Sequence, residues 1–431
     1  MIELDRAGLN RILPAAPGSA DWDDVLRRFR AHRSRRRRRT MVTLAVASLA
    51  VVLLVVPALG LGGRLLQLIT SPGTGPEVWG ISWSPDGTRL AFHTGWVDDT
   101  GVYVLTADGS SWRMTRVGKG TAEWPPAVWS PDGEWLAFPG AGKRSVHVVK
   151  RDGGGRRTVA RTQADVTGLV WSPDGRKLAF LTSPNAPDGH REASLVNLDG
   201  SGRRNLWRDW GLVELPVWSP DGRMIAFTAR SGSSNNRAIY VANADWTGRR
   251  RLAQGARPRW SPDGRRIAFQ VFPSASGARR TAIHVVNIDG SGRRRIAQDG
   301  GGAAWSPDGR RIAFMIGGGQ FAPPPDVYVV NADGSGQRRL TRDRSSGFNS
   351  WSPDGRKILY VSARGNNEIY VVRPDGSGRR NLTRNPTFDG QPAWSPDGRR
   401  IAFSSKRDGK WGVYLMNADG SGQQRLAQPR P

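Results

Sequence analysis

The chain has no cysteine among its 431 residues, so disulfide bonds and thiolate metal ligands are excluded. Its five histidines form no His-Glu-x-x-His pattern, and no Gly-x-Ser-x-Gly turn is present to carry a nucleophilic serine. Acidic residues are scarce: 37 Asp and Glu stand against 64 Lys and Arg, for a net charge of +27. From these absences we expect no enzyme, no cofactor and no metal site.

A repeated motif is what the sequence does contain. The residues Trp-Ser-Pro-Asp-Gly occur eight times at intervals of 42 to 47 residues, beginning at Trp83, Trp129, Trp171, Trp218, Trp260, Trp305, Trp351 and Trp394. A period of this length, with several short strands in each unit, is typical of a β-propeller. We therefore predict an all-β fold, an eight-bladed propeller over residues 78–431.

The last repeat shows the expected blade most clearly. A turn at 396–398 follows the motif tryptophan, and Ile401–Phe403 is apolar enough for a buried second strand. A third strand is expected at 413–416, and a fourth ends at Leu426 after a turn at 417–422. Each blade should therefore have four antiparallel strands of its own, and no borrowed strand is needed to complete the ring.

Comparison of the eight repeats separates scaffold from site. The second turn always carries an aspartate, and Phe or Tyr always closes the second strand, from Phe92 to Phe403. His147 and His284 occupy third-strand positions that are tyrosine in other repeats. A catalytic residue is needed once, so we interpret residues that recur eight times as structural. The second-turn aspartates are Asp108, Asp152, Asp199, Asp245, Asp289, Asp333, Asp375 and Asp419.

These motifs carry a family resemblance. Trp-Ser-Pro-Asp-Gly-Arg-Arg-Ile-Ala-Phe, followed by Ile-Tyr-Val-Val-Asn-Ala-Asp-Gly-Ser-Gly, resembles the TolB-type, WD40-like propeller repeat over about residues 78 to 427. The resemblance implies a propeller, a fold that hosts scaffolds, gated peptidases and some lyases. Nothing before the repeats resembles the separate N-terminal domain of TolB.

The N-terminal region has the pattern of a membrane anchor. Residues 1–40 form a basic tail that ends in the run Arg35–Arg39, and 41–61 are apolar and long enough to span a bilayer. Basic residues before the span place the N-terminus in the cytoplasm and the propeller outside, joined by a tether at 62–77. A cleaved signal peptide, with Ala58 and Gly60 as its small residues, is the alternative.

A short amphipathic stripe lies within the tail. Trp22, Val25, Leu26 and Phe29 share one face of a helix at this spacing. The stripe fits either a docking helix for a cytoplasmic partner or a helix that lies on the membrane surface.

The two faces of the predicted ring differ in composition. Both tight turns of every blade open on one face, where arginines flank them, so this face either binds an anionic surface or is a solvated rim. The opposite face carries loops that differ between repeats, where binding residues are usually found. Aromatic and acidic residues of blades eight, one and two predict a partner-binding patch there, unless the tryptophans only cover blade edges: Trp96, Asp98, Asp99, Glu123, Trp124 and Trp411.

Together these features predict a non-catalytic scaffold at the cell envelope. We expect a single-pass protein of the cell membrane whose extracytoplasmic, monomeric ring binds an envelope protein or a polysaccharide, and no nucleic acid. One alternative is an envelope sensor that couples ligand binding outside to the cytoplasmic tail. A polysaccharide-acting propeller enzyme is a further alternative, and it requires a cluster of histidines in the channel.

Overall fold

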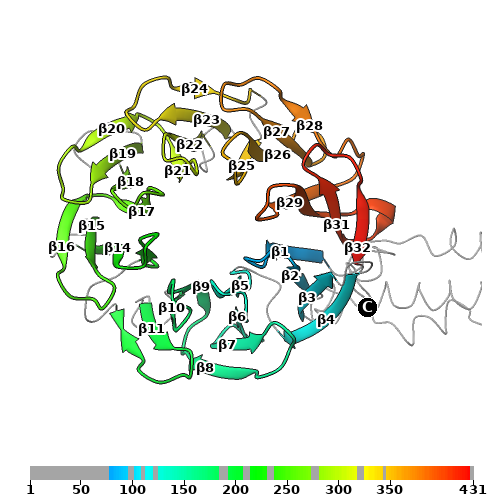
Figure 1. Cartoon of the computed structure of the whole chain (residues 1–431), viewed down its shortest axis with the longest axis horizontal. Helices are drawn as coiled ribbons and strands as arrows, with labels where there is room; N and C mark the ends of the chain where they lie inside the picture. The colour runs from blue at the N-terminus through cyan, green and yellow to red at the C-terminus, as the bar shows by residue number, and fades with distance from the viewer. Residues whose placement is uncertain are drawn as a thin grey trace, which may run out of the picture. The chain divides into compact units, whose positions relative to one another are not determined.

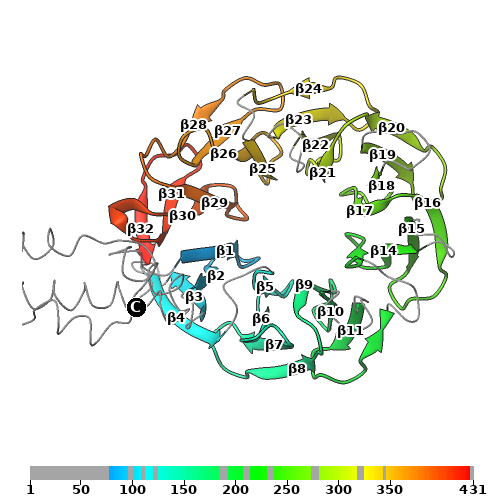
Figure 2. The same cartoon turned by 180° about the vertical axis from the view of Figure 1, so that it is seen from behind.

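The computed structural model describes residues 77–95, 101–107, 112–119, 125–183, 193–206, 214–230, 237–272, 281–317, 325–342 and 346–427. The chain divides into two units, Met1–Pro72 and Gly73–Pro431, and every described residue lies in the second. These residues form eight four-stranded antiparallel sheets arranged as blades around one axis (Figure 1 and, from behind, Figure 2). The predicted all-β propeller with eight four-stranded blades is confirmed.

Each blade is built from one repeat, with its first strand nearest the axis (Figure 1). The first two blades contain β1 (Glu77–Trp83), β2 (Arg89–Gly95), β3 (Gly101–Ala107), β4 (Trp112–Lys119), β5 (Val128–Trp129), β6 (Trp135–Pro139), β7 (Ser145–Lys150) and β8 (Arg157–Arg161). Blades three and four contain β9 (Val166–Trp171), β10 (Lys177–Thr182), β11 (Ala193–Asn197), β12 (Arg204–Asn205), β13 (Val217–Trp218), β14 (Met224–Arg230), β15 (Arg237–Asn243) and β16 (Arg250–Gln254).

The second half of the ring repeats this plan. Blades five and six contain β17 (Ala256–Trp260), β18 (Arg266–Val271), β19 (Ala282–Asn287), β20 (Arg294–Ala297), β21 (Gly301–Trp305), β22 (Arg311–Ile316), β23 (Asp326–Asn331) and β24 (Arg338–Arg339). Blades seven and eight contain β25 (Ser346–Trp351), β26 (Ile358–Ser362), β27 (Glu368–Val372), β28 (Arg380–Asn381), β29 (Asp389–Trp394), β30 (Arg400–Ser405), β31 (Gly412–Asn417) and β32 (Gln424–Ala427), with a 3-10 turn at η3 (Arg407–Gly409). Blade eight supplies all four of its strands, as predicted.

The hydrophobic core lies between blades. Eight clusters of buried side chains each combine two neighbouring blades, and one of them joins Leu90 and Phe92 of blade one to Val413 and Leu415 of blade eight. The aromatic residue that closes each second strand has no exposed surface, because blades cover both faces of that strand. Apolar packing of the eighth blade against the first therefore closes the ring.

The motif tryptophans link the innermost strands of neighbouring blades. In six repeats the indole Nε1 donates to the carbonyl oxygen of the residue before the previous blade's tryptophan, at 2.8 to 3.3 Å. The donors are Trp83, Trp129, Trp171, Trp260, Trp305 and Trp351. This role repeats around the axis, as expected for a scaffold residue.

The turn aspartates organise their own turns. The Ser261 hydroxyl donates to Oδ1 of Asp263 at 2.5 Å and accepts from the Arg266 amide at 2.9 Å, and the same bonds recur in other repeats. In the second turn, Asp419 accepts from both the hydroxyl and the amide of Ser421, and these bonds lower the pKa of Asp419. Asp108 lies outside the described residues. The structural interpretation of the other turn aspartates agrees with these contacts.

No helix within the described part of the chain is both long enough and apolar enough to cross a membrane. The predicted tail at 1–40, the span at 41–61 and the tether up to residue 76 lie outside the described residues.

Candidate functional site: the loop face of the ring

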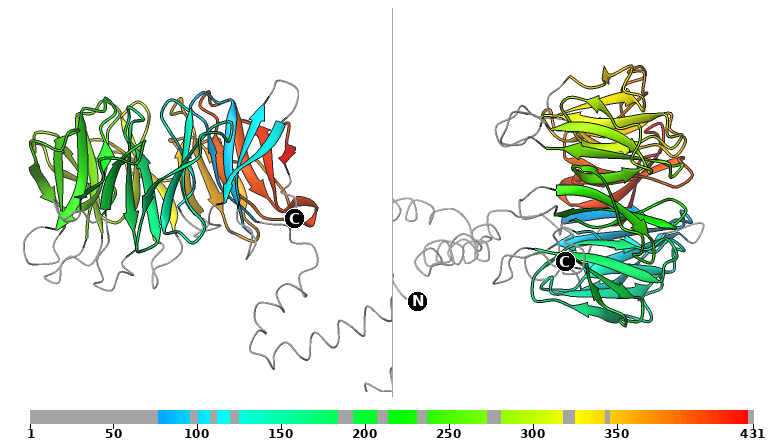
Figure 3. Two further views of the ribbon diagram at one scale, coloured as in Figure 1. Left: turned by 90° about the horizontal axis from the view of Figure 1, so that it is seen from below. Right: turned by 90° about the vertical axis from the view of Figure 1, so that its left-hand side faces the viewer.

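The two faces of the ring are defined by strand direction. The turns after the first and third strands open on one side, the turn face, and the loops after the second and fourth strands open on the other, the loop face (Figure 3). Arginines of the turn face lie over aromatic rings: Arg249 is 4.3 Å from the ring centre of Tyr240, and Arg379 is 5.1 Å from that of Tyr370. These arginines therefore pack on the blades as well as making the rim basic.

Of the predicted tryptophan patch, one residue, Trp411, lies within the described part of the chain. Trp411 is partly buried in the cluster between blades eight and one, and its ring meets that of Phe388 edge-on at 5.0 Å. Trp96, Asp98, Asp99, Glu123 and Trp124 lie outside the described residues. The patch therefore stays a prediction, in which Trp411 has a packing role.

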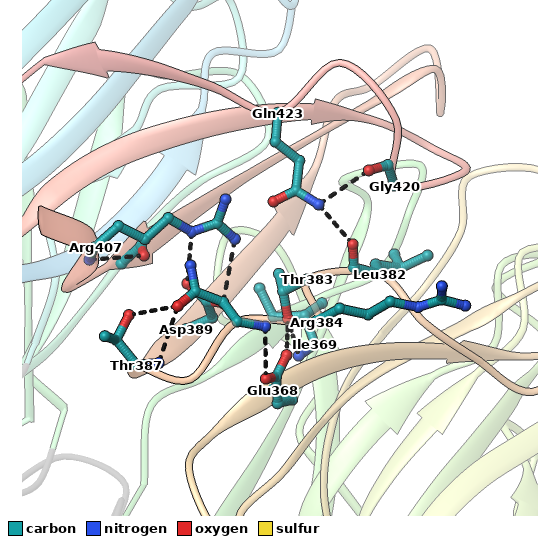
Figure 4. A network of polar contacts seen from close by, with 12 residues as sticks. Glu368, Ile369, Leu382, Thr383, Arg384, Thr387, Asp389, Arg407, Gly420 and Gln423 are labelled. Atoms are coloured by element: carbon teal, nitrogen blue, oxygen red, sulfur yellow. Dashed lines mark hydrogen bonds and ion pairs between the residues drawn. The ribbon is translucent and has the colours of Figure 1, made fainter.

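Buried carboxylates on the loop face hold the junction of blades seven and eight (Figure 4). Asp389 has no exposed surface, and its Oδ2 lies 3.2 Å from the Arg407 guanidinium. Burial raises the pKa of Asp389, although the bonds from Ser405 and Arg407 oppose this shift. Glu368 accepts from the Asn385 amide at 2.9 Å and from the Thr383 hydroxyl. These contacts fix the chain between β28 and β29.

Blade six repeats the arrangement of blade seven. Asp326 and Glu368 each begin a third strand, and each accepts a hydrogen bond from a threonine that follows the fourth strand. Thr341 is that threonine for Asp326, and Arg339 also pairs with this carboxylate. Because every group is occupied by a neighbour, these carboxylates anchor loops rather than present a reactive site.

A more accessible cluster lies at the junction of blades four and five. Glu214 accepts from the Thr228 hydroxyl at 2.8 Å and from the Arg257 amide at 3.0 Å. Its other oxygen lies 3.5 Å from the Arg237 guanidinium and 3.9 Å from that of Arg257. The Arg257 guanidinium also lies 5.6 Å from the ring centre of Phe272. We call Glu214, Arg237, Arg257 and Phe272 the arginine cluster.

The arginine cluster presents cationic and aromatic surface to solvent. The side chains of Arg257 and Arg237 are 58% and 48% exposed, and Phe272 is 37% exposed. Glu214 holds both guanidinium groups near one place, and the Arg257 guanidinium also donates to Oε1 of Gln270 at 3.3 Å. Exposed Arg beside an aromatic ring is a common anchor in protein interfaces. The geometry suits a carboxylate or another acidic group.

Arg257 also has an unusual backbone. Its φ is +57°, within a β-bulge of β17; the matching residues with positive φ are Gly80 and Gly302 in blades one and six and a second non-glycine residue, Gln391, in blade eight. A non-glycine residue in this region costs roughly 1–2 kcal/mol. Backbone strain of this kind is concentrated at functional sites. Since Gln391 shares this conformation, the positive φ belongs to the bulge of the repeat, and the distinguishing feature of blade five is an arginine at this position. Comparison of the repeats contained this signal, although the sequence alone did not lead us to it.

The three histidines within the described residues have structural roles. His93 is buried and its Nε2 accepts from the Ala127 amide at 2.7 Å, which joins blades one and two. His147 stacks on Phe138, and the ring of His284 lies 5.6 Å from that of Phe269. Burial lowers the pKa of both, to about 4 for His284, with help from neighbouring arginines. The packing role predicted for His147 and His284 agrees with these contacts.

Over the described residues, no group of three or more His, Asp or Glu side chains is placed to hold a metal ion.

Fold and sequence repeat together define the class of this protein as an eight-bladed β-propeller. The TolB beta propeller domain family matches residues 77–256, 254–366 and 350–429, most of the chain, so the chain belongs to this family. This fold suggests a protein-interaction role. No curated protein matches the chain.

Solved structures share the fold at low sequence identity. TolB from Acinetobacter baumannii is 19% identical, with a TM-score of 0.39 over 67% of this chain and 77% of that one. A prolyl endopeptidase is 14% identical, with a TM-score of 0.53 over 80% of this chain and 55% of that one. Porphyromonas gingivalis dipeptidyl peptidase 4 is 16% identical, with a TM-score of 0.51 over 72% and 53%. The chain spans about half the length of these two peptidases.

The peptidases correct one expectation from the sequence. The conclusion that the chain is not an enzyme is overturned, because proteins named as peptidases contain the same propeller fold. Missing sequence motifs were a weak basis for that conclusion. The fold therefore leaves enzymatic activity open.

Proposed function

We propose that this protein is a membrane-anchored propeller that binds a partner at the cell envelope through its loop face. The observation that carries the proposal is the arginine cluster, where Arg257 keeps a positive φ and a side chain that is 58% exposed. The apolar segment at 41–61 supports the anchor, and the preceding basic run supports a ring outside the cytoplasm. The partner is an envelope protein, or a polysaccharide, with acidic groups that the two arginines bind.

A rigid ring and blade-specific loops support the scaffold role. The turns, motif tryptophans and strand-closing aromatics repeat in every blade, so they do not distinguish one ligand from another. The arginine cluster occurs once among the described residues, at the junction of blades four and five. A single site on a symmetric scaffold allows a partner to bind in one orientation.

The topology is tested by adding protease to intact cells. The ring should be digested or released while residues 1–40 stay protected, because the basic tail stays in the cytoplasm. Full protection of the propeller would contradict the proposed orientation. A mature protein that begins near residue 61 would show that the apolar segment is a cleaved signal.

Partner binding is tested by photo-crosslinking in cells. A crosslinking residue in place of Phe272 samples the arginine cluster, and the same residue in place of Arg265 samples the turn face as a control. We expect a discrete crosslinked product from position 272 that disappears with Arg257→Ala and has no counterpart at 265. Identical products from both positions, or one insensitive to Arg257→Ala, would contradict the proposal.

A further inference from the structure

The junction of blades five and six shows how this ring holds a guanidinium group. Arg266 is six residues after the motif tryptophan of blade five, and its guanidinium lies 5.0 Å from the ring centre of Trp305 in blade six. The same group donates to the Gly309 carbonyl at 3.0 Å and lies 3.8 Å from the Asp263 carboxylate. An indole face, a carbonyl oxygen and a carboxylate thus surround one arginine.

The junction of blades eight and one uses the same stacking contact. Arg400, again six residues after a motif tryptophan, lies 5.2 Å from the ring centre of Trp83. A guanidinium over the next blade's tryptophan is therefore a recurring way of filling this space between the turns of adjacent blades.

The junction of blades three and four has the same surroundings, but among the described residues no arginine is stacked on its tryptophan, although the charges of Arg176 and Lys177 act on Asp174. Lys177 occupies the position of Arg266, and a cavity of about 300 Å³ opens between the turns. The cavity lining includes Asp174, Trp218 and Gly222, which are the repeat counterparts of Asp263, Trp305 and Gly309. Lys177 is not part of that lining.

A second observation marks this junction as open. Trp218 makes no indole bond to the preceding blade within the described residues, unlike Trp305, whose Nε1 donates to Arg259 at 3.0 Å. Trp394 is the other motif tryptophan whose preceding blade carries lysine at this position, and its Nε1 also has no hydrogen-bond partner in the described part of the chain. Lysine therefore accompanies the less tightly linked junctions.

We propose that the cavity beside Trp218 is a binding site for the guanidinium group of a ligand. The ligand is either an arginine side chain of a partner protein or a small alkylguanidine. Its planar cation stacks on the Trp218 indole, donates to the Gly222 carbonyl and faces the Asp174 carboxylate. Arg266 makes the equivalent contacts at the junction of blades five and six. The site is on the turn face and is independent of the loop-face function proposed above.

The chemistry of the cavity selects a guanidinium over an ammonium. A planar guanidinium stacks on an indole and still directs N–H groups in its plane toward oxygens, whereas an ammonium is compact and strongly hydrated. Asp221 adds a second carboxylate to the lining, which favours a cation over a neutral isostere. Cation–π contact contributes roughly 0.5–2 kcal/mol, so we expect the cavity to bind a single arginine weakly.

The test follows tryptophan indole signals by NMR on the full chain, labelled with ¹⁵N-tryptophan and kept in solution with a mild detergent. Trp218→Phe assigns the Trp218 signal. Capped arginine, N-acetyl-arginine methylamide, should shift this signal in a saturable way, and the neutral citrulline analogue should bind at least ten-fold more weakly. Agmatine serves as the small alkylguanidine: stronger binding by capped arginine favours a partner's side chain, and stronger binding by agmatine favours a small ligand.

Two variants make the test specific. Lys177→Arg should place the chain's own guanidinium over Trp218, restore the arrangement at Trp305 and abolish the ligand-induced shift. Arg266→Ala should open the matching space at Trp305, so that the Trp305 signal becomes sensitive to capped arginine. The proposal is wrong if Lys177→Arg leaves binding intact, if the citrulline analogue binds equally well, or if no ligand shifts Trp218 in the folded wild type.

Discussion

The indole Nε1 of Trp260 donates a hydrogen bond to the carbonyl oxygen of Val217, 2.8 Å away in the first strand of the preceding blade. The bond joins two residues that are 43 positions apart in sequence and lie on neighbouring blades near the axis. Five other motif tryptophans make the equivalent bond. The motif that defines the repeat is therefore also a link between repeats.

This relationship predicts unequal effects of one substitution at two matched sites. Trp260→Phe removes the hydrogen bond and replaces the indole with a smaller phenyl group. Trp218→Phe only makes the side chain smaller, because Trp218 makes no such bond among the described residues. The bond should account for about 1 kcal/mol of extra loss at position 260. Urea unfolding monitored by circular dichroism measures both variants. Equal losses would show that ring packing alone determines the role of the tryptophan.

His284 should make the ring sensitive to mild acid. Burial, aided by Arg293 and Arg295, lowers the pKa of His284 from 6.5 to about 4. Between about pH 6.5 and 4, His284 is therefore protonated in the unfolded chain and neutral in the folded chain, so the free energy of unfolding falls as the pH drops through this range. Tyr240 and Tyr328 occupy the matching third-strand position in blades four and six. His284→Tyr should therefore fit the blade and reduce this loss of stability. The measurement is the melting temperature of wild type and His284→Tyr at pH 7 and pH 5. The prediction is wrong if the difference between the two pH values is the same in both proteins.

The positive φ of Arg257 should lower the stability of the folded protein. Relief of the positive φ by Arg257→Gly gains roughly 1–2 kcal/mol, and the entropy of glycine offsets roughly 0.5–1 kcal/mol of this. Both Arg257→Gly and Arg257→Ala lose the exposed ion pair with Glu214, which contributes little, so we expect a small net gain for glycine. Arg257→Ala keeps the strain and should be less stable than Arg257→Gly. Both variants should lose partner crosslinking from position 272. A glycine variant less stable than wild type would show that the arginine contacts outweigh the strain.

The fold was predictable because each repeat contains what its blade needs. The turn hydrogen bonds, such as those of Ser261 and Asp263, connect residues that are two to five positions apart, and the buried strands are continuous apolar runs. The arginine cluster was not predictable in this way. Glu214 and Arg257 are 43 residues apart and meet only when blades four and five stack. The predicted patch rested on tryptophans, and Trp411 among them is half-buried by packing.

Arg407 should depend on an acceptor oxygen at position 389, because the two side chains form a buried pair. Asp389→Ala leaves a guanidinium that is only 16% exposed without its carboxylate, and such a loss typically costs about 3–5 kcal/mol. Asp389→Asn keeps an acceptor oxygen for Arg407 and should cost far less. Urea unfolding at pH 7 separates the two variants, and equal losses would show that the negative charge itself is required.

The pH dependence of this pair gives an independent check. Because burial raises the pKa of Asp389, its stabilising contribution is complete below the ordinary value of 3.8 and is lost as the pH rises through the raised value. Lowering the pH toward 4 should therefore increase the stability of the wild type relative to Asp389→Asn, which cannot take up the proton. The comparison between these two proteins cancels His284 and the turn aspartates, which both contain. A relative stability that falls toward acid pH would instead mean that the ion pair with Arg407 outweighs the cost of burying the carboxylate.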